Sequence, residues 1–109
     1  MTTPHAACIF ERDVERDGSS MSARVEACYR LAERLCLRVL DEYLAWDAAT
    51  AVAGKPEALS EAVDECVRSS AALITYSIDA LSDDAQVRQW VADTLVGLDL
   101  LTVVNEGEQ

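Results

Sequence analysis

The stretch at residues 87–104, VRQWVADTLVGLDLLTVV, constrains the fold most, because as a helix it would be apolar on two opposite faces. One stripe at helical spacing consists of Val87, Trp90, Val91, Leu95, Leu98 and Leu101. The second stripe, on the far side, consists of Val96, Leu100 and Val103. A helix that is apolar on both faces is unfavourable at the surface of a monomer, so the second stripe predicts the interface of a homodimer.

Two earlier segments also carry apolar residues at i, i+3, i+4 and i+7 spacing, which is typical of amphipathic helices. The 109 residues include only 4 Gly and 2 Pro, so few positions favour a break in the chain. These patterns predict an all-α fold: a small bundle of three main helices, at about residues 23–53, 57–81 and 83–104, completed by dimerisation. We expect a flexible N-terminal arm at residues 1–20, a single helical domain at 21–105 and a frayed acidic tail at 106–109.

The charge is strongly negative and unevenly distributed. Nine basic and twenty acidic residues give a formal net charge of −11. Residues 1–40 hold six acids and six bases, whereas residues 41–109 hold fourteen acids and three bases. Such a field repels DNA, RNA and anionic membranes, so we expect no direct nucleic-acid or membrane binding. The N-terminus lacks the pattern of a secretory signal, and no apolar run is long enough to span a bilayer, which predicts a cytoplasmic protein.

Residues suited to catalysis or metal binding are scarce. The one histidine, His5, lies in the predicted arm, which leaves no candidate for a catalytic triad or for histidine acid–base chemistry. The four cysteines, Cys8, Cys28, Cys36 and Cys66, show no CxxC spacing. We therefore expect buried structural thiols, with a stored soft metal such as Cu(I) as the alternative. The sequence predicts no enzyme, no cofactor and no metal site.

A candidate partner-binding surface lies on the first predicted helix. Arg30, Arg34 and Arg38 follow one another at i+4 spacing. Leu37 and Leu44 lie beside them, seven residues apart and outside the core stripe of that helix. An apolar strip with a basic border, on a protein that is otherwise acidic, predicts a contact with another protein.

In overall character the chain resembles the small helical antiactivators of bacterial quorum sensing, which act as dimers and sequester a transcription factor. The resemblance rests on the chain length, on the long helix expected at residues 23–53 and on the doubly apolar segment at 87–104. It implies a non-enzymatic regulator that binds and inhibits a partner protein, with a transcriptional activator of quorum sensing as the candidate partner.

Two other functions stay open at this point. Carboxylates between residues 57 and 99 predict an acidic nucleic-acid mimic that occupies the groove of a DNA- or RNA-binding protein, as a phage-type inhibitor would. Glu57, Glu61 and Asp64 are loosely similar to the ExxE and ExxD pairs with which all-α nucleotide pyrophosphohydrolases hold Mg²⁺. These three carboxylates lie opposite the apolar stripe of their predicted helix, which disfavours the metal-dependent alternative.

Overall fold

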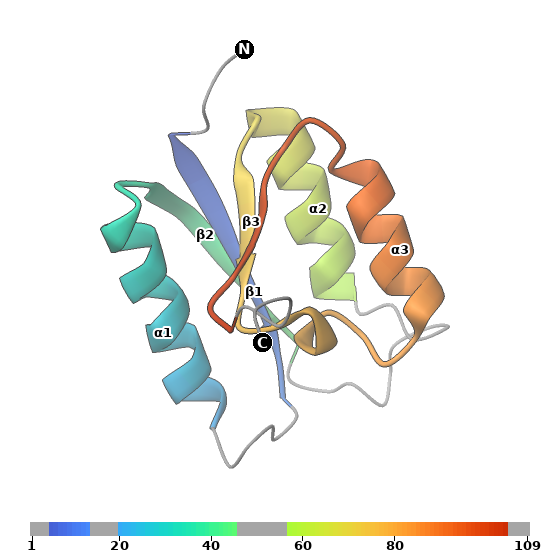
Figure 1. Ribbon diagram of the computed structural model, residues 1–109, viewed down its shortest axis with the longest axis horizontal. Coiled ribbons are helices and arrows are strands. Elements are labelled where there is room, and N and C mark those ends of the chain that lie inside the picture. The colour runs from blue at the N-terminus through green and yellow to red at the C-terminus, as the bar shows by residue number, and fades with distance from the viewer. Residues whose placement is uncertain (1–4, 14–19, 46–56, 105–109) are drawn as a thin grey trace.

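The structure, a computed structural model, describes residues 5–13, 20–45 and 57–104, which form a parallel sheet flanked by helices (Figure 1). The elements in chain order are β1 (Ala6–Arg12), α1 (Met21–Arg34), β2 (Arg38–Ala45), α2 (Glu57–Ser69), β3 (Ala72–Thr75), the 3-10 helix η2 (Ile78–Ala80), α3 (Ala85–Thr94) and β4 (Leu100–Thr102). The strand order is β2-β1-β3-β4, and all three pairs of neighbours are parallel. The protein is therefore an α/β domain, and the predicted all-α bundle is wrong.

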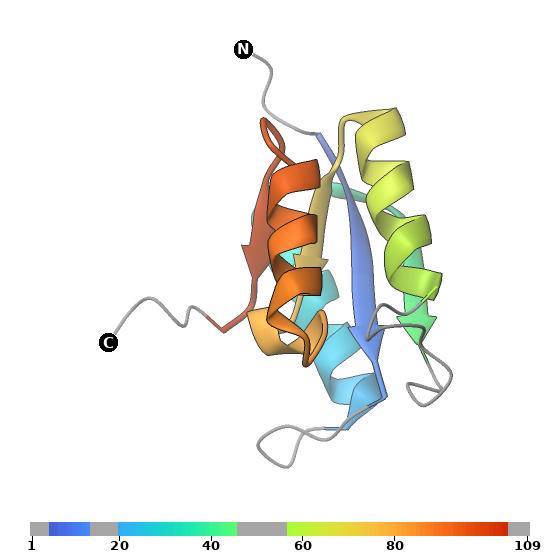
Figure 2. The ribbon, with the colours of Figure 1, turned by 90° about the vertical axis from the view of Figure 1, so that its right-hand side faces the viewer.

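The described helices cover the two faces of the sheet unequally. Helix α1 lies on one face, whereas α2 and α3 lie together on the other (Figures 1 and 2). Two buried clusters correspond to these layers: the cluster under α2 and α3 contains Phe10 and Leu73, and the cluster under α1 contains Ile9 and Ile74. These pairs alternate along β1 and β3 because successive side chains of a strand point to opposite faces.

The predicted N-terminal arm contains the strand on which the rest of the sheet is built. Strand β1 lies between β2 and β3, and Ala7, Cys8, Ile9 and Phe10 are fully buried. A central strand that is covered on both faces needs apolar residues in succession rather than in alternation, so its short apolar run lacks the period-2 signal of a half-exposed strand. The rest of the predicted arm, residues 1–4 and 14–19, and the predicted acidic tail lie outside the described residues.

The helix predicted at residues 23–53 ends at Arg34, and its second half contains β2. Cys36 adopts a left-handed φ of 58°, and the backbone N–H of Leu37 donates to Ala32 O, which is a typical helix stop. The register of β2 against β1 then shifts beside Ala7, as a β-bulge does. The extra residue breaks the alternation of apolar side chains in β2, and the resulting spacing is similar to that of a helix. Residues 46–53 lie outside the described part of the chain.

The other two predicted helices are also interrupted by strands. Helix α2 ends at Ser69, and Ser70 has a φ of 53° before β3 begins. All four residues of β3 are buried, and such a run cannot be distinguished from a buried helix by periodicity. Helix α3 ends at Thr94, and Gly97, with a φ of 86°, leads into β4.

The predicted dimer stripe is therefore divided between a loop and a strand. Val96 lies between α3 and β4 and is 79% exposed. Leu100 packs against the cluster under α2 and α3, whereas Val103 packs against the cluster under α1. The three residues share no face, although the homodimer itself stays a prediction.

Candidate functional site

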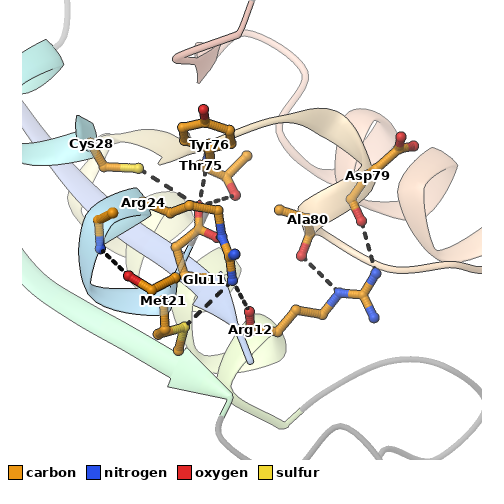
Figure 3. Close-up of polar contacts among 11 residues, drawn as sticks. Glu11, Arg12, Met21, Arg24, Cys28, Thr75, Tyr76, Asp79 and Ala80 are labelled. Atoms are coloured by element: carbon orange, nitrogen blue, oxygen red, sulfur yellow. Dashed lines mark hydrogen bonds and ion pairs between the residues drawn. The ribbon is translucent and has the colours of Figure 1, made fainter. Parts of the chain in front are cut away.

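The candidate site lies at the carboxyl ends of β1 and β3, where the strand order reverses. The connection from β1 through α1 places β2 on one side of β1, and the connection from β2 through α2 places β3 on the other side. Doubly wound α/β proteins bind their ligands in the crevice outside this switch point. Here, side chains from β1, α1, β3 and η2 meet at this position (Figure 3).

A buried carboxylate, Glu11 at the end of β1, is the centre of this cluster. Glu11 is 0% exposed and Arg24, from the first turns of α1, is 1% exposed. Arg24 Nε donates to Glu11 Oε1 at 3.1 Å. Glu11 Oε2 accepts from Thr75 Oγ1 at 3.2 Å and from the backbone N–H of Tyr76 at 2.5 Å. A buried ion pair is tolerated when further hydrogen bonds satisfy its members, and this arrangement provides them.

The next residue, Arg12, connects β1 to the segment after β3. Its guanidinium is almost fully buried and donates from Nε to Ala80 O at 2.9 Å and from Nη2 to Asp79 O at 2.8 Å. It also forms an ion pair with Asp83 Oδ1 at 2.9 Å. Its backbone carbonyl accepts from Arg24 Nη2 at 2.7 Å. Arg12 thus binds the carbonyls of Asp79 and Ala80, which fastens η2 to the end of β1.

The thiol nearest to this cluster is held in its protonated form. Burial raises the pKa of Cys28, and the adjacent negative charge of Glu11 raises it further. Cys28 Sγ lies 3.7 Å from Glu11 Oε2 and donates its proton to that carboxylate. The thiol is therefore a neutral donor at physiological pH and is not poised as a nucleophile.

Charges around the edge of the crevice do not favour an anion. Arg88 Nη1 donates to Ser82 O at 2.9 Å and lies 3.8 Å from Asp79 Oδ1. Asp83 pairs with Arg12, and Asp84 caps α3 by accepting from the backbone N–H of Gln86. The arginines of this region are thus each engaged by carboxylates or carbonyls, which leaves no basic surface for a phosphate at this edge of the described structure.

The site residues predicted from the sequence lie elsewhere. Arg30 and Arg34 are exposed on α1, Arg38 is exposed at the start of β2, and Leu37 and Leu44 are half-buried. Leu37 and Leu44 line hollows beside α1, considered further below. Whether these five residues bind a partner stays a prediction.

The carboxylates considered for Mg²⁺ are dispersed. Glu57, Glu61 and Asp64 are exposed along α2. Among the described residues, no group of three or more His, Cys, Asp or Glu side chains could hold a metal ion. Three of the cysteines are buried, whereas Cys36 is exposed in the turn after α1. Within the same described ranges, no helix has the length and apolar character needed to cross a membrane.

These features define the class of the protein: an open, doubly wound α/β domain whose switch point is filled by polar side chains. No protein-family model matches the sequence, and no curated protein matches it. The fold is similar to that of the N-terminal catalytic domain of TP901-1 integrase in its crystal structure, with a TM-score of 0.70. The similarity covers 90% of this chain and 76% of that chain at 15% sequence identity, which shows a shared fold.

The observed fold corrects the function expected from the sequence. The antiactivator hypothesis depended on a long helix at residues 23–53 and a doubly apolar helix ending at 104, and neither exists. The pyrophosphohydrolase alternative required a helical bundle and is wrong for the same reason. The acidic-mimic alternative is corrected with them, because its carboxylates between residues 57 and 99 were expected on two long helices of a bundle and instead belong to the helices and loops of an α/β domain.

Proposed function

We propose that this chain is a non-catalytic domain of integrase-type fold, which takes part in DNA integration through another protein rather than by cutting DNA. The observation that supports this proposal is that, among the described residues, the chain's own side chains occupy the switch point. The Glu11–Arg24 pair and the Arg12 guanidinium fill the place where α/β domains bind their ligands.

Phosphoryl transfer on DNA requires a nucleophile and cationic groups that can face a phosphate. Within the described residues of this edge, Ser77 and Ser82 are buried, and the exposed Ser20 caps α1 because its Oγ accepts from the Ala23 N–H. Cys28 is held protonated, and Arg12 and Arg24 are turned inward. The formal net charge of −11 further opposes contact with the DNA backbone. The same proposal includes that the chain needs no cofactor and that it acts in the cytoplasm.

The test is an assay of DNA binding and cleavage with the whole chain. Supercoiled plasmid and an end-labelled duplex are incubated with the protein at about 150 mM salt, with and without Mg²⁺. We expect no nicking, no covalent protein–DNA species on a denaturing gel and no saturable change in fluorescence anisotropy. Nicking or a covalent species that co-purifies with the protein would overturn the proposal.

A variant distinguishes a structural from a catalytic role for Arg12. If the guanidinium only fastens η2 to β1, Arg12→Ala lowers the urea midpoint of unfolding and changes no DNA readout. Arg30→Ala is the matched control, because that exposed arginine pairs with Glu26 on its own helix. A folded Arg12→Ala protein that loses a DNA-cleaving activity of the wild type would show that the residue is catalytic.

A further inference from the structure

A groove runs beside α1, along the margin of the sheet. Two hollows of about 520 and 380 Å³ share Glu26 and Tyr29 in their walls and together make up this α1–β2 groove. Its apolar surface comes from both elements: Met21, Val25 and Ala32 on α1, Leu37 in the turn, and Val39 and Leu44 on β2. A helix is about 10 Å wide and strands lie about 4.8 Å apart, so one helix covers about two strands of four. The margin over β2 is left open.

The strand beneath the groove is an edge strand, and one amide at its centre is engaged by a neighbouring side chain, because the Glu42 N–H donates to Asp41 Oδ1 at 2.8 Å. Among the described strands, β2 pairs only with β1, so the backbone groups on its other side point away from the sheet. Val39, Glu42 and Leu44 of β2 face the groove. A segment laid beside β2 as a fifth strand would direct alternate side chains into the same space, against Val25 and Tyr29 of α1.

The border of the groove is acidic. Its walls contain three carboxylates, Glu26, Glu33 and Glu42, and one guanidinium, Arg30, which pairs with Glu26. Tyr29 donates to Glu42 Oε2 at 2.6 Å, which places a 40% exposed aromatic ring beside the carboxylate. An apolar floor, a ring and excess carboxylates suit lysine or arginine side chains, whose stems are apolar and whose ends are cationic.

A second copy of the chain fits this edge poorly. The centre of β2 is formed by Asp41 and Glu42, which are both exposed. If two copies paired antiparallel about that centre, either the two Asp41 side chains or the two Glu42 side chains would lie directly opposite each other, because opposite residues share a face and neighbours in one strand do not. Like charges directly opposite each other destabilise a strand pair, so the edge disfavours self-pairing and favours a basic segment.

We propose that the α1–β2 groove binds an extended, basic segment of a partner protein, which adds to the sheet at β2 and inserts alternate side chains beneath α1. This inference rests on the proposed function, in which the chain acts through another protein. It names the surface that binds that protein and the chemistry of the bound segment. It does not depend on the absence of catalysis.

The probe is a fluorescent ten-residue peptide of alternating valine and lysine, titrated against the whole chain by anisotropy. We expect saturable binding, no binding of the valine–glutamate counterpart, and loss of binding when alternate backbone nitrogens of the probe are methylated. Hydrogen exchange should show slower exchange of β2 amides in the complex. Absence of binding, equal binding of the acidic peptide, or binding without protection of β2 would each overturn the proposal.

Charge reversal separates the groove from general attraction. The double variant Glu26→Lys with Glu42→Lys should weaken probe binding by on the order of tenfold, which equals about 1.4 kcal/mol. The matched control is Glu61→Lys with Asp64→Lys, which makes the same change in net charge on the exposed face of α2. An equal loss in both variants would show non-specific attraction and contradict the groove.

A failure here is distinct from a failure of the proposed function. If the probe does not bind and the protein still leaves DNA intact, the non-catalytic assignment stands and the groove is rejected. If the wild type sediments as a dimer that Glu42→Lys alters, the occupant is a second copy, which also overturns the basic-segment proposal.

Discussion

Removal of Arg24 is the sharpest test of how the switch point is stabilised. Arg24→Met keeps the length and apolar stem of the side chain but leaves Glu11 buried without its ion-pair partner. Breaking a buried pair by removing one member typically costs about 3–5 kcal/mol, because the remaining charge stays desolvated. The hydrogen bond from Arg24 Nη2 to Arg12 O is lost as well.

The cost is large relative to the stability of a domain of this size. Unfolding free energies are about 5–15 kcal/mol, and each 1 kcal/mol shifts the melting temperature by roughly 4–8 °C in a domain of up to 100 residues. Arg24→Met should therefore lower the melting temperature by more than about 12 °C. Urea unfolding followed by circular dichroism gives the free energy directly.

A second substitution checks the reasoning. Replacing both members, as in Glu11→Leu with Arg24→Met, removes the desolvated charge and should recover much of the lost stability. The hydroxyl of Thr75 and the N–H of Tyr76 then lose their acceptor, so recovery should be incomplete. A loss below about 1 kcal/mol for Arg24→Met alone would refute a structural role for the pair.

Three other predictions concern single groups. Burial, and then the charge of Glu11, raises the pKa of Cys28 in the folded state, so the unfolded chain loses this proton first as the pH rises. The free energy of unfolding should therefore fall above about pH 9, and it should fall less in Cys28→Ala. The hydrogen bond to Glu42 raises the pKa of Tyr29 to about 12, so ultraviolet titration should show a late tyrosine that Glu42→Ala returns toward 10. Ser70 has a left-handed φ of 53°, so Ser70→Gly should raise the free energy of unfolding by about 0.5 kcal/mol in urea titrations; a decrease would contradict this.

Helix beginnings were more predictable than helix ends. The starts of α2 at Glu57 and α3 at Ala85 lie close to the predicted starts, because the apolar spacing there is truly helical. The ends were missed because non-glycine residues, Cys36 and Ser70, occupy the left-handed positions where a glycine would signal a stop. Each strand that follows has an apolar pattern compatible with a helix. In β2 a bulge breaks the strand alternation, and in β3 every residue is buried, so no alternation is present.

The candidate site was hidden for a related reason. The predicted N-terminal arm includes Glu11 and Arg12, although charged residues directly after the apolar run of residues 6–10 are also typical of the carboxyl end of a buried strand. Arg24 was one of several arginines in its region, and nothing local distinguishes a buried arginine from an exposed one. Only the position of β1 in the centre of the sheet brings these three residues together.

The occupied switch point and the open groove are connected through α1. Arg24 and Cys28, four residues apart, lie on the inner face of the helix and contact Glu11. Val25 and Tyr29 each follow one of them by one residue and are therefore turned by about 100°, which places them on the flank over β2. The buried pair thus fixes the rotation of α1 about its axis, and that rotation determines which side chains form the groove wall. A domain whose described switch point is occupied by its own side chains would in this way keep a defined surface for a partner.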